Sequence, residues 1–236
     1  MAKSSSNMSS FFENVKQIGI AVVLAMLIKT SVVEAYKIPS ASMEDTLLIG
    51  DFLLANKFKY GAPIPLTDWR LPAIREPERG DVIIFLTPKD RVTKYIKRCV
   101  AVGGDTVEIK NKVLYVNGEE IKVPDHAKHV EPTIIPRGQG GRNSRDNYGP
   151  KEVKPDHFFM MGDNRDNSYD SRYWGEVPKE LILGEAMAVH WSWCEDCNPS
   201  PDVSLEDPLS VHRMFLYNAI HFFEKVRWDR LFGPIS

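Results

Sequence analysis

Short apolar runs separated by turn residues make up most of the chain after residue 50. Many of these runs alternate apolar with polar positions or are rich in β-branched and aromatic residues, and Gly, Pro, Asn and Asp bound them. This pattern is typical of half-buried β-strands. We therefore predict a mainly β body, with strands at residues 51–57, 81–86, 94–102, 106–109, 113–116, 119–123, 157–161 and 183–193.

Two stretches between these runs suggest how the body is divided. Asn117-Gly118 separates two of the runs, which is the strongest short-range signal for a β-hairpin. Residues 124–156 are polar, rich in Gly, Pro and Arg, and long for a loop, so they predict an extended excursion or a second small domain. We accordingly expect the first part of a β domain at 34–123 and its last part at 157–193.

An apolar segment lies near the N-terminus. Residues 18–28 are uninterrupted apolar sequence between Lys16 and Lys29, and eleven residues are too few to span a bilayer. If Lys29 extends its amine to the interface, residues 17–33 supply 17 positions, the lower edge of the spanning range. We predict a transmembrane anchor at 17–33, preceded by a polar N-terminus at 1–16.

The charges around the anchor indicate its orientation. Lys3 and Lys16 precede it and Glu34 follows it, so the positive-inside rule favours a cytoplasmic N-terminus and a body on the exported side. Lys29 and Lys37 act in the opposite direction. Two other interpretations stay open: a cleaved signal peptide, because small residues occur at 33 and 35, and a buried core helix.

The C-terminal tail at 194–236 carries two further features. Residues 211–232 place aromatic and aliphatic residues among basic ones, which predicts an amphipathic helix that packs on the body or lies on a membrane surface. Cys194 and Cys197 form a C-x-x-C, while Cys99 stands alone. A single C-x-x-C is a weak zinc signal and fits a disulfide or two idle thiols equally well.

The overall composition narrows the classes of function. The chain has 236 residues, of which 43% are hydrophobic and 26% are charged, as in a globular protein. Its formal net charge is −2, so no global basic field points to nucleic acid. Any chemistry must therefore come from local motifs.

The first such motif is KIPSASMEDTLLIG at residues 37–50. Pro39 fixes its own φ and pushes Ile38 into an extended conformation, so Ser40 and Ser42 project to the same side if the chain stays extended. A serine hydroxyl needs a base to become a nucleophile. A Ser-rich turn that merely leaves a membrane anchor is the other interpretation of this stretch.

A lysine is the candidate for the base. The chain has six histidines, none in a recognisable triad motif, and it has no G-x-S-x-G elbow. Lys97 sits inside an apolar strand, on the same face as Tyr95 and Cys99. Desolvation there would lower its pKa toward the neutral amine that a base must be. Lys94 lies on the opposite face with Arg98, and Lys97 could instead be an edge-strand residue whose amine extends to water.

The loop GDNRDNSYDSR at residues 162–172 mixes opposite charges with short hydrogen-bonding side chains. Such a loop can hold itself rigid by internal pairing. A calcium loop formed by Asp163, Asp166 and Asp170 is an alternative. The arginines within the loop and the lack of an EF-hand pattern argue against it.

Taken in order, IPSASM, YIKRCVAVGGD and MGDNRDNSYDSRYWG resemble the motifs of type I signal peptidases, also called leader peptidases. The resemblance in order and layout extends from the anchor to about Ala188. It implies two antiparallel β-sheet domains after one N-terminal transmembrane helix. The chain departs from the family pattern at Ala41, where Gly is frequent, and at Asp45, where Pro is frequent.

The resemblance also implies roles for individual residues. Ser42 matches the nucleophile and Lys97 the general base. Ser40 matches a hydroxyl of the oxyanion hole, and Ser168 matches the hydroxyl that orients the lysine amine. The supporting ion pairs would be Asp170 with Arg172 and Asp163 with Arg98. The residues that would line pockets for small substrate side chains are Tyr36, Ile38, Met43, Leu47, Tyr95 and Ile96.

The function implied is a membrane-bound serine endopeptidase that removes N-terminal signal peptides from exported preproteins after small residues. Its location would be the bacterial inner membrane, with one span, the N-terminus in the cytoplasm and the catalytic domain on the exported side. We expect a monomer whose partners are preprotein signal peptides and membrane lipid, with no nucleic acid, no metal and no cofactor. A non-catalytic peptide-binding homologue and a self-cleaving, repressor-like Ser–Lys peptidase are the rivals.

Overall fold

The computed structural model describes residues 11–22, 33–61, 69–122, 124, 127–137, 145–204, 207 and 209–235. Residues 11–22 are helical. The expected anchor at 17–33 lies largely outside the described residues, which omit 23–32. Across the described ranges, no helix combines the length and the apolar character that a bilayer crossing requires.

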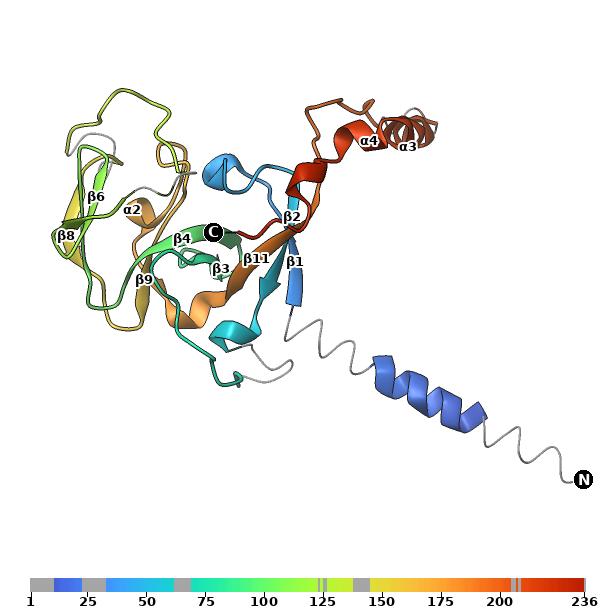
Figure 1. The fold of residues 1–236 in the computed structure, drawn as a ribbon, viewed down its shortest axis with the longest axis horizontal. Helices are drawn as coiled ribbons and strands as arrows, with labels where there is room; N and C mark the ends of the chain where they lie inside the picture. Colours follow the sequence, from blue (N-terminus) through green and yellow to red (C-terminus); the bar gives the residue numbers. More distant parts are fainter. Residues whose placement is uncertain are drawn as a thin grey trace, which may run out of the picture.

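The body is built on two antiparallel sheets, which confirms the mainly β prediction (Figure 1). The larger sheet has seven strands in the order β1-β2-β11-β3-β4-β9-β10. Every neighbouring pair in it is antiparallel. Its strands are β1 (Val33–Lys37), β2 (Asp51–Asn56), β3 (Val82–Leu86), β4 (Lys94–Val102), β9 (His157–Met161), β10 (Val177–Pro178) and β11 (Ile182–Ser192).

The smaller sheet has four strands in the order β7-β6-β5-β8. Its strands are β5 (Thr106–Lys110), β6 (Val113–Val116), β7 (Glu119–Glu120) and β8 (Tyr148–Glu152). The turn at Asn117-Gly118 joins β6 to β7, as its sequence predicts, and Asn117 has the positive φ (55°) that such a turn needs. Only β8 comes from the expected excursion at 124–156, so the second sheet begins earlier in the chain than that excursion.

Helices and single helical turns complete the elements described. They are η1 (Ala41–Met43), η2 (Phe58–Tyr60), α2 (Ser171–Trp174), η3 (Lys179–Leu181), α3 (Ser210–Ile220), α4 (Phe222–Lys225) and η4 (Trp228–Arg230). The helix expected at 211–232 is therefore broken. The chain leaves helical conformation after Lys225 because Val226 forms a β-bridge with Trp193.

Strand β3 shows why the centre of the large sheet reads as a continuous apolar run. Val82 and Ile84 face one buried cluster, while Ile83 and Phe85 face another on the opposite side of the sheet. A strand covered on both faces has no polar side to alternate with. Strands β4 and β9 contribute to a third cluster with β5, β6 and β8, and this cluster joins the two sheets.

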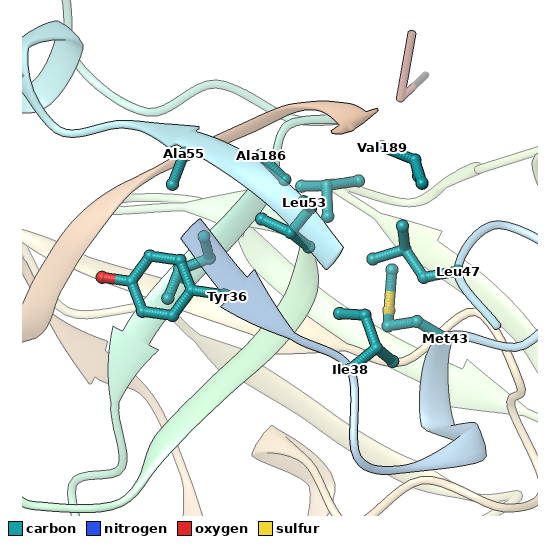
Figure 2. Packing of buried hydrophobic residues seen from close by; sticks show 10 residues of the cluster. Tyr36, Ile38, Met43, Leu47, Leu53, Ala55, Ala186 and Val189 are labelled. Carbon is teal, nitrogen blue, oxygen red and sulfur yellow. The ribbon is translucent and has the colours of Figure 1, made fainter. Parts of the chain in front are cut away.

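The first cluster supports the segment that carries Ser42. Ile38, Met43 and Leu47 point toward one another beneath this segment (Figure 2). Met43 is 2% exposed and Leu47 is fully buried. Burial of side chains of this size is worth about 1.5–3 kcal/mol each. The turn η1 is therefore fixed to the core by the residue immediately after Ser42.

The C-terminal segment returns to the large sheet after α4. Arg230 donates to the carboxylate of the fully buried Asp51 at 2.6 Å, and the Ser192 hydroxyl donates to the same carboxylate at 2.6 Å. Cys194 and Cys197 form a disulfide next to this junction. Helices α3 and α4 project from this end of the sheet, on the side away from the small sheet (Figure 1).

Candidate active site

Backbone hydrogen bonds place the serine turn at the end of β1. The Ile38 N–H donates to the Asp51 carbonyl at 2.8 Å, and the Gly50 N–H donates to the Ile38 carbonyl at 3.1 Å. Between these contacts the chain forms an Ω-like loop that begins with Pro39. Ser40 is extended, but the chain turns into η1 at Ala41 and does not stay extended as the prediction from the sequence assumed; the Oγ atoms of Ser40 and Ser42 nevertheless lie 3.4 Å apart.

Lys97 reaches this turn from strand β4. Its Nζ donates to the Ser42 Oγ at 2.5 Å and to the Ile96 carbonyl at 3.1 Å. The amine also lies 5.4 Å from the centre of the Tyr95 ring. Lys97 as a whole is only 4% exposed. The sheet thus brings together the two residues that the sequence nominated as nucleophile and base, 55 positions apart.

The electrostatic environment favours a neutral amine. Burial is the largest influence and lowers the pKa of Lys97 from 10.5 to about 8, with Arg172 acting in the same direction. The carboxylates of Asp170 and Asp163 act against this shift, but more weakly than burial does. An amine with this pKa exists in appreciable amounts as a free base near pH 8, which an ordinary lysine does not.

Both of those carboxylates are already paired with arginines. Arg98 donates to Asp163 through Nε at 2.9 Å and through Nη2 at 2.7 Å. Arg172 donates to Asp170 through Nε and Nη2, each at 2.8 Å. All four side chains are at most 5% exposed. Burial alone would raise the pKa of Asp170. The charge of Arg172 and the hydrogen bonds that the Asp170 carboxylate accepts lower this pKa below its ordinary value.

The loop at 162–172 also clamps the serine turn through its backbone. The Asn164 N–H donates to the Ser42 carbonyl at 3.1 Å, and the Asn164 amide donates to the Ala41 carbonyl at 3.1 Å. The Thr46 hydroxyl donates to Asp163 at 2.7 Å. Sequence reasoning missed Asn164, although its position within the third motif was a signal that it could have used.

The calcium alternative for this loop fails on its charges. Asp166 accepts hydrogen bonds from Lys112 at 3.0 Å and from the Glu131 N–H at 2.8 Å. With Asp163 and Asp170 also paired, the three carboxylates point to separate cations. No group of His, Cys, Asp and Glu side chains within the described ranges is arranged to hold a metal ion.

Ser168 lies beside the site but makes no hydrogen bond to the lysine amine. Its residue is 6% exposed, and its Oγ has no hydrogen-bond partner among the described residues that meets ordinary geometry. The hydroxyl packs against Gly162, close to the Ser42 carbonyl, and helps to lower the pKa of Asp170. The hydrogen bond to Lys97 that the resemblance implies is therefore not formed in this structure.

A cavity of about 510 Å³ opens beside the two serines. Of the six expected pocket residues, five line it, whereas Leu47 is fully buried in the core below. Lys37, Thr93, Lys94, Asn167 and Tyr169 contribute to the walls and were not foreseen as pocket residues. The lining residues are Tyr36, Lys37, Ile38, Pro39, Ser40, Ala41, Ser42, Met43, Thr93, Lys94, Tyr95, Ile96, Lys97, Asn167 and Tyr169.

Lys94 also lines this cavity, but its amine is paired with Glu34 and not with the serines. Its Nζ donates to the Glu34 carboxylate at 3.0 Å and lies 4.9 Å from the centre of the Tyr36 ring. The Tyr36 hydroxyl donates to the same carboxylate at 2.7 Å. Glu34 thus ties one wall of the cavity to the other.

A serine hydroxyl that contacts a buried lysine amine of lowered pKa, beside an apolar cavity, is the arrangement that a serine hydrolase requires. The comparisons with known proteins make the class specific. Residues 11–191 match the family described as signal peptidase, peptidase S26. The chain therefore belongs to the type I signal peptidases, a family of serine proteases.

Individual relatives agree with this assignment. A signal peptidase I from Pseudomonas aeruginosa is 39% identical over 208 residues, which cover 77% of this chain and 71% of that protein. A signal peptidase I from Aquifex aeolicus is 34% identical, with 85% of this chain and 91% of that protein covered. A solved signal peptidase I structure from Enterococcus faecalis V583 is 27% identical and covers 48% of this chain and 98% of that one. Its TM-score of 0.38 is too low to support an argument about the fold.

The contact between the loop and the serine turn leaves no room for a side chain at Gly162. A Cβ there would overlap both the Ser168 Oγ and the Ser42 carbonyl oxygen. We expect Gly162→Ala to displace the serine turn and to lower the kcat/KM of preprotein cleavage by about a hundredfold, the effect of a misplacement of about 1 Å. Gly233→Ala is the matched control, because its Cβ would meet only the Arg230 carbonyl at 3.4 Å. Wild-type activity in Gly162→Ala would contradict the tight packing described here.

Proposed function

We propose that this protein is a membrane-bound serine endopeptidase with a Ser42–Lys97 dyad, which cleaves N-terminal signal peptides from exported preproteins after small residues. The observation that carries the proposal is the 2.5 Å hydrogen bond from the Lys97 Nζ to the Ser42 Oγ. Burial penalises the charged form of the amine, so a buried lysine that contacts a serine hydroxyl is suited to accept its proton.

The proposed reaction begins with neutral Lys97. Its Nζ accepts the proton of the Ser42 hydroxyl while the Oγ attacks the carbonyl carbon of the scissile peptide bond. Collapse of the tetrahedral intermediate breaks the C–N bond, and protonated Lys97 gives its proton to the leaving amine. Lys97 then accepts a proton from water, which hydrolyses the acyl-enzyme and restores Ser42. These steps use only the two side chains and water.

In the tetrahedral intermediate the negative charge lies on the former carbonyl oxygen, and hydrogen-bond donors must surround this oxygen. The Ser40 hydroxyl and the Ser42 backbone N–H are the groups that we assign to this role. Their support is the proximity of the two hydroxyls at the mouth of the cavity. One such donor is worth about 2.7–4 kcal/mol of transition-state stabilisation in a comparable protease.

The remaining motif residues act through Lys97 and Ser42. The pairs Asp163–Arg98 and Asp170–Arg172 fix the loop whose backbone holds the serine turn. We assign Ser168 to this framework as well, with a contact to the amine that would form only when the hydroxyl rotates. Both carboxylates are paired with arginines, Arg172 in the loop and Arg98 on β4, so they shape the environment of Lys97 without taking its proton.

The cavity suits an extended peptide with small side chains. Strand β1 is an edge strand of the large sheet, so its free side can pair with the backbone of a bound peptide. Tyr36, Ile38, Met43 and Ile96 reduce the space for side chains just before the cut. Substrates with Phe one or three residues before the scissile bond should therefore resist cleavage, and comparison of their kcat/KM with that of the Ala substrate measures this. Equal rates would contradict the pocket assignment.

We also propose that residues 17–33 anchor the enzyme in the bacterial inner membrane as a monomer, with the N-terminus in the cytoplasm. Lys3 and Lys16 on one side and Glu34 on the other support this orientation. Protease added outside intact spheroplasts should degrade the body and leave a tag at residue 1 protected. Full protection of the body would show the opposite orientation.

Substitution of the base gives the most direct test of the dyad. We expect Lys97→Arg and Ser42→Ala to lose preprotein cleavage in detergent, because a guanidinium does not release its proton in this pH range and alanine has no nucleophile. Lys110→Arg makes the same change on β5 of the small sheet, away from the cavity, and should keep wild-type activity. If Lys97→Arg stays active while the substitution of a histidine abolishes cleavage, the base has been assigned wrongly.

The pH dependence reports the same group. Only the neutral amine can act as the base, and burial lowers the pKa of Lys97 to about 8. The kcat/KM should therefore be low at pH 6, rise through pH 8 and level off above it. An activity that is already maximal at pH 6 would exclude Lys97 as the titrating base. The measurement uses an uncharged substrate so that only the enzyme titrates.

A further inference from the structure

Helix α3 has its apolar side turned away from the protein. Val211, Phe215, Leu216 and Ile220 are 51%, 73%, 61% and 68% exposed. Their spacing of four residues, 211 with 215 and 216 with 220, places them in two adjacent rows on one face of the helix. His212, four residues before Leu216, is the polar side chain in the second of these rows. A surface helix normally turns such a face toward the core.

The opposite face of the helix forms hydrogen bonds with the segment that precedes it and with α4. The Asn218 Oδ1 accepts from the Ser200 hydroxyl and from the Lys225 Nζ, each at 2.6 Å. The Tyr217 hydroxyl donates to the Asn198 Oδ1 at 2.6 Å. The outward orientation of the apolar rows is therefore fixed by specific contacts.

Lys225 locks this arrangement. It is fully buried, donates to the Ser200 hydroxyl at 2.6 Å, and lies 5.5 Å from the Trp193 ring and 5.3 Å from the Tyr217 ring. Two aromatic faces stabilise a buried ammonium by cation–π attraction. Removal of this lysine would loosen the mount, whereas substitution on the outer rows would leave it intact.

Aromatic side chains extend the apolar surface past the end of α3. Phe223, in α4, is 74% exposed and follows Ile220 by three residues. Its ring stacks on that of Trp228 with their centres 5.8 Å apart, and Trp228 is itself 49% exposed. We call Val211, Phe215, Leu216, Ile220, Phe223 and Trp228 the C-terminal apolar face. It lies beyond residue 191, where the match to the family ends.

We propose that the C-terminal apolar face lies in the interfacial layer of a lipid bilayer, with α3 parallel to the membrane plane. At 1.5 Å per residue, an 11-residue helix is about 16 Å long, too short to cross a membrane and of a kind that lies in the interface. Exposed Trp and Phe beside aliphatic residues are typical of this layer.

The position of the face in the fold favours lipid over a second copy of the chain. The Lys37 amine binds Glu195 at 2.8 Å, and the Trp193 N–H donates to the Gly50 carbonyl at 2.9 Å, so the base of the α3 mount adjoins the C-terminal end of β1. Strand β1 is the element that leads back to the apolar segment at 17–33. Helix α3 and strand β1 both lie on the side of the molecule away from the small sheet (Figure 1). This step rests on the anchor in the proposed function.

The consequence is a second point of membrane contact. The anchor alone lets the body rotate about a single attachment. A second contact, through the C-terminal apolar face, would hold the cavity at a defined orientation to the bilayer, because Lys37 both lines the cavity and binds the base of the α3 mount. Preproteins that are themselves embedded in the membrane would benefit from this, whereas short soluble peptides would not.

The test uses the full-length protein in vesicles of phosphatidylethanolamine and phosphatidylglycerol. A bimane label is attached to Phe215→Cys, and the control label to Val130→Cys, which is 55% exposed and lies in the segment before β8. Cys99 is buried and the other two cysteines form a disulfide, so labelling proceeds without reductant. Phospholipids with a nitroxide near the headgroup should quench the label at 215 and not the label at 130.

Three outcomes separate the interpretations. Quenching of the 215 label by nitroxide lipid, with protection from aqueous iodide, supports the proposal. Quenching by iodide alone overturns it. Energy transfer between labelled copies that disappears on dilution with unlabelled protein, without lipid quenching, identifies a second copy as the occupant and also overturns it.

Activity provides the second readout and keeps the two proposals distinct. The variant Phe215→Ser/Leu216→Ser/Ile220→Ser should cleave a short soluble peptide at the wild-type rate, and its cleavage of a membrane-embedded preprotein should fall severalfold. Equal rates for both substrates would overturn the membrane contact and leave the dyad untouched. Failure of the wild type itself to cleave either substrate would instead refute the proposed function.

Discussion

The two buried arginine–carboxylate pairs around Lys97 are the interactions on which the rest of the site depends. Asp163 and Asp170 lie close enough to raise the pKa of the lysine, and either of them, if unpaired, would be a natural partner for its ammonium. Arg98 and Arg172 occupy both carboxylates with two hydrogen bonds each. The amine is thereby left with a hydroxyl and a carbonyl as its partners, and burial then dominates its ionisation.

The same two ion pairs also fix the position of the serine turn. Because Asp163 and Asp170 begin and close the loop, their pairing fixes the backbone of Asn164, which in turn holds the carbonyl of Ser42. Met43 secures the other side of the turn by burial in the core. A single rigid unit therefore sets both the position of the hydroxyl and the ionisation of the amine. Breaking one such pair would leave an uncompensated buried charge, typically at a cost of about 3–5 kcal/mol.

Many features of the fold and of the site could be predicted from the sequence because they depend on residues that are close together in the chain. Strand alternation placed Lys97 apart from Lys94, and the Asn117-Gly118 turn marked its hairpin. What the sequence did not reveal depends on packing between distant segments. No local pattern says that β8 joins the sheet of β5, that Leu47 lies in the core and does not line the cavity, or that Ser168 makes no hydrogen bond to the Lys97 amine. The break in the C-terminal helix likewise follows from the bridge between Val226 and Trp193.

Strand β1 has one further implication for how the enzyme would select a bond to cut. The strand begins at Val33, directly after the proposed anchor, and Tyr36 and Lys37 near its end already form the wall of the cavity. Five extended residues span about 16 Å, so the wall lies at a fixed distance along the chain from the point where the strand begins. For a substrate anchored in the same bilayer, the distance from the membrane to its scissile bond would start at the same surface. The strand would then act as a ruler, and the spacing between a signal peptide's apolar segment and its scissile bond would be matched to a length built into the enzyme's own backbone.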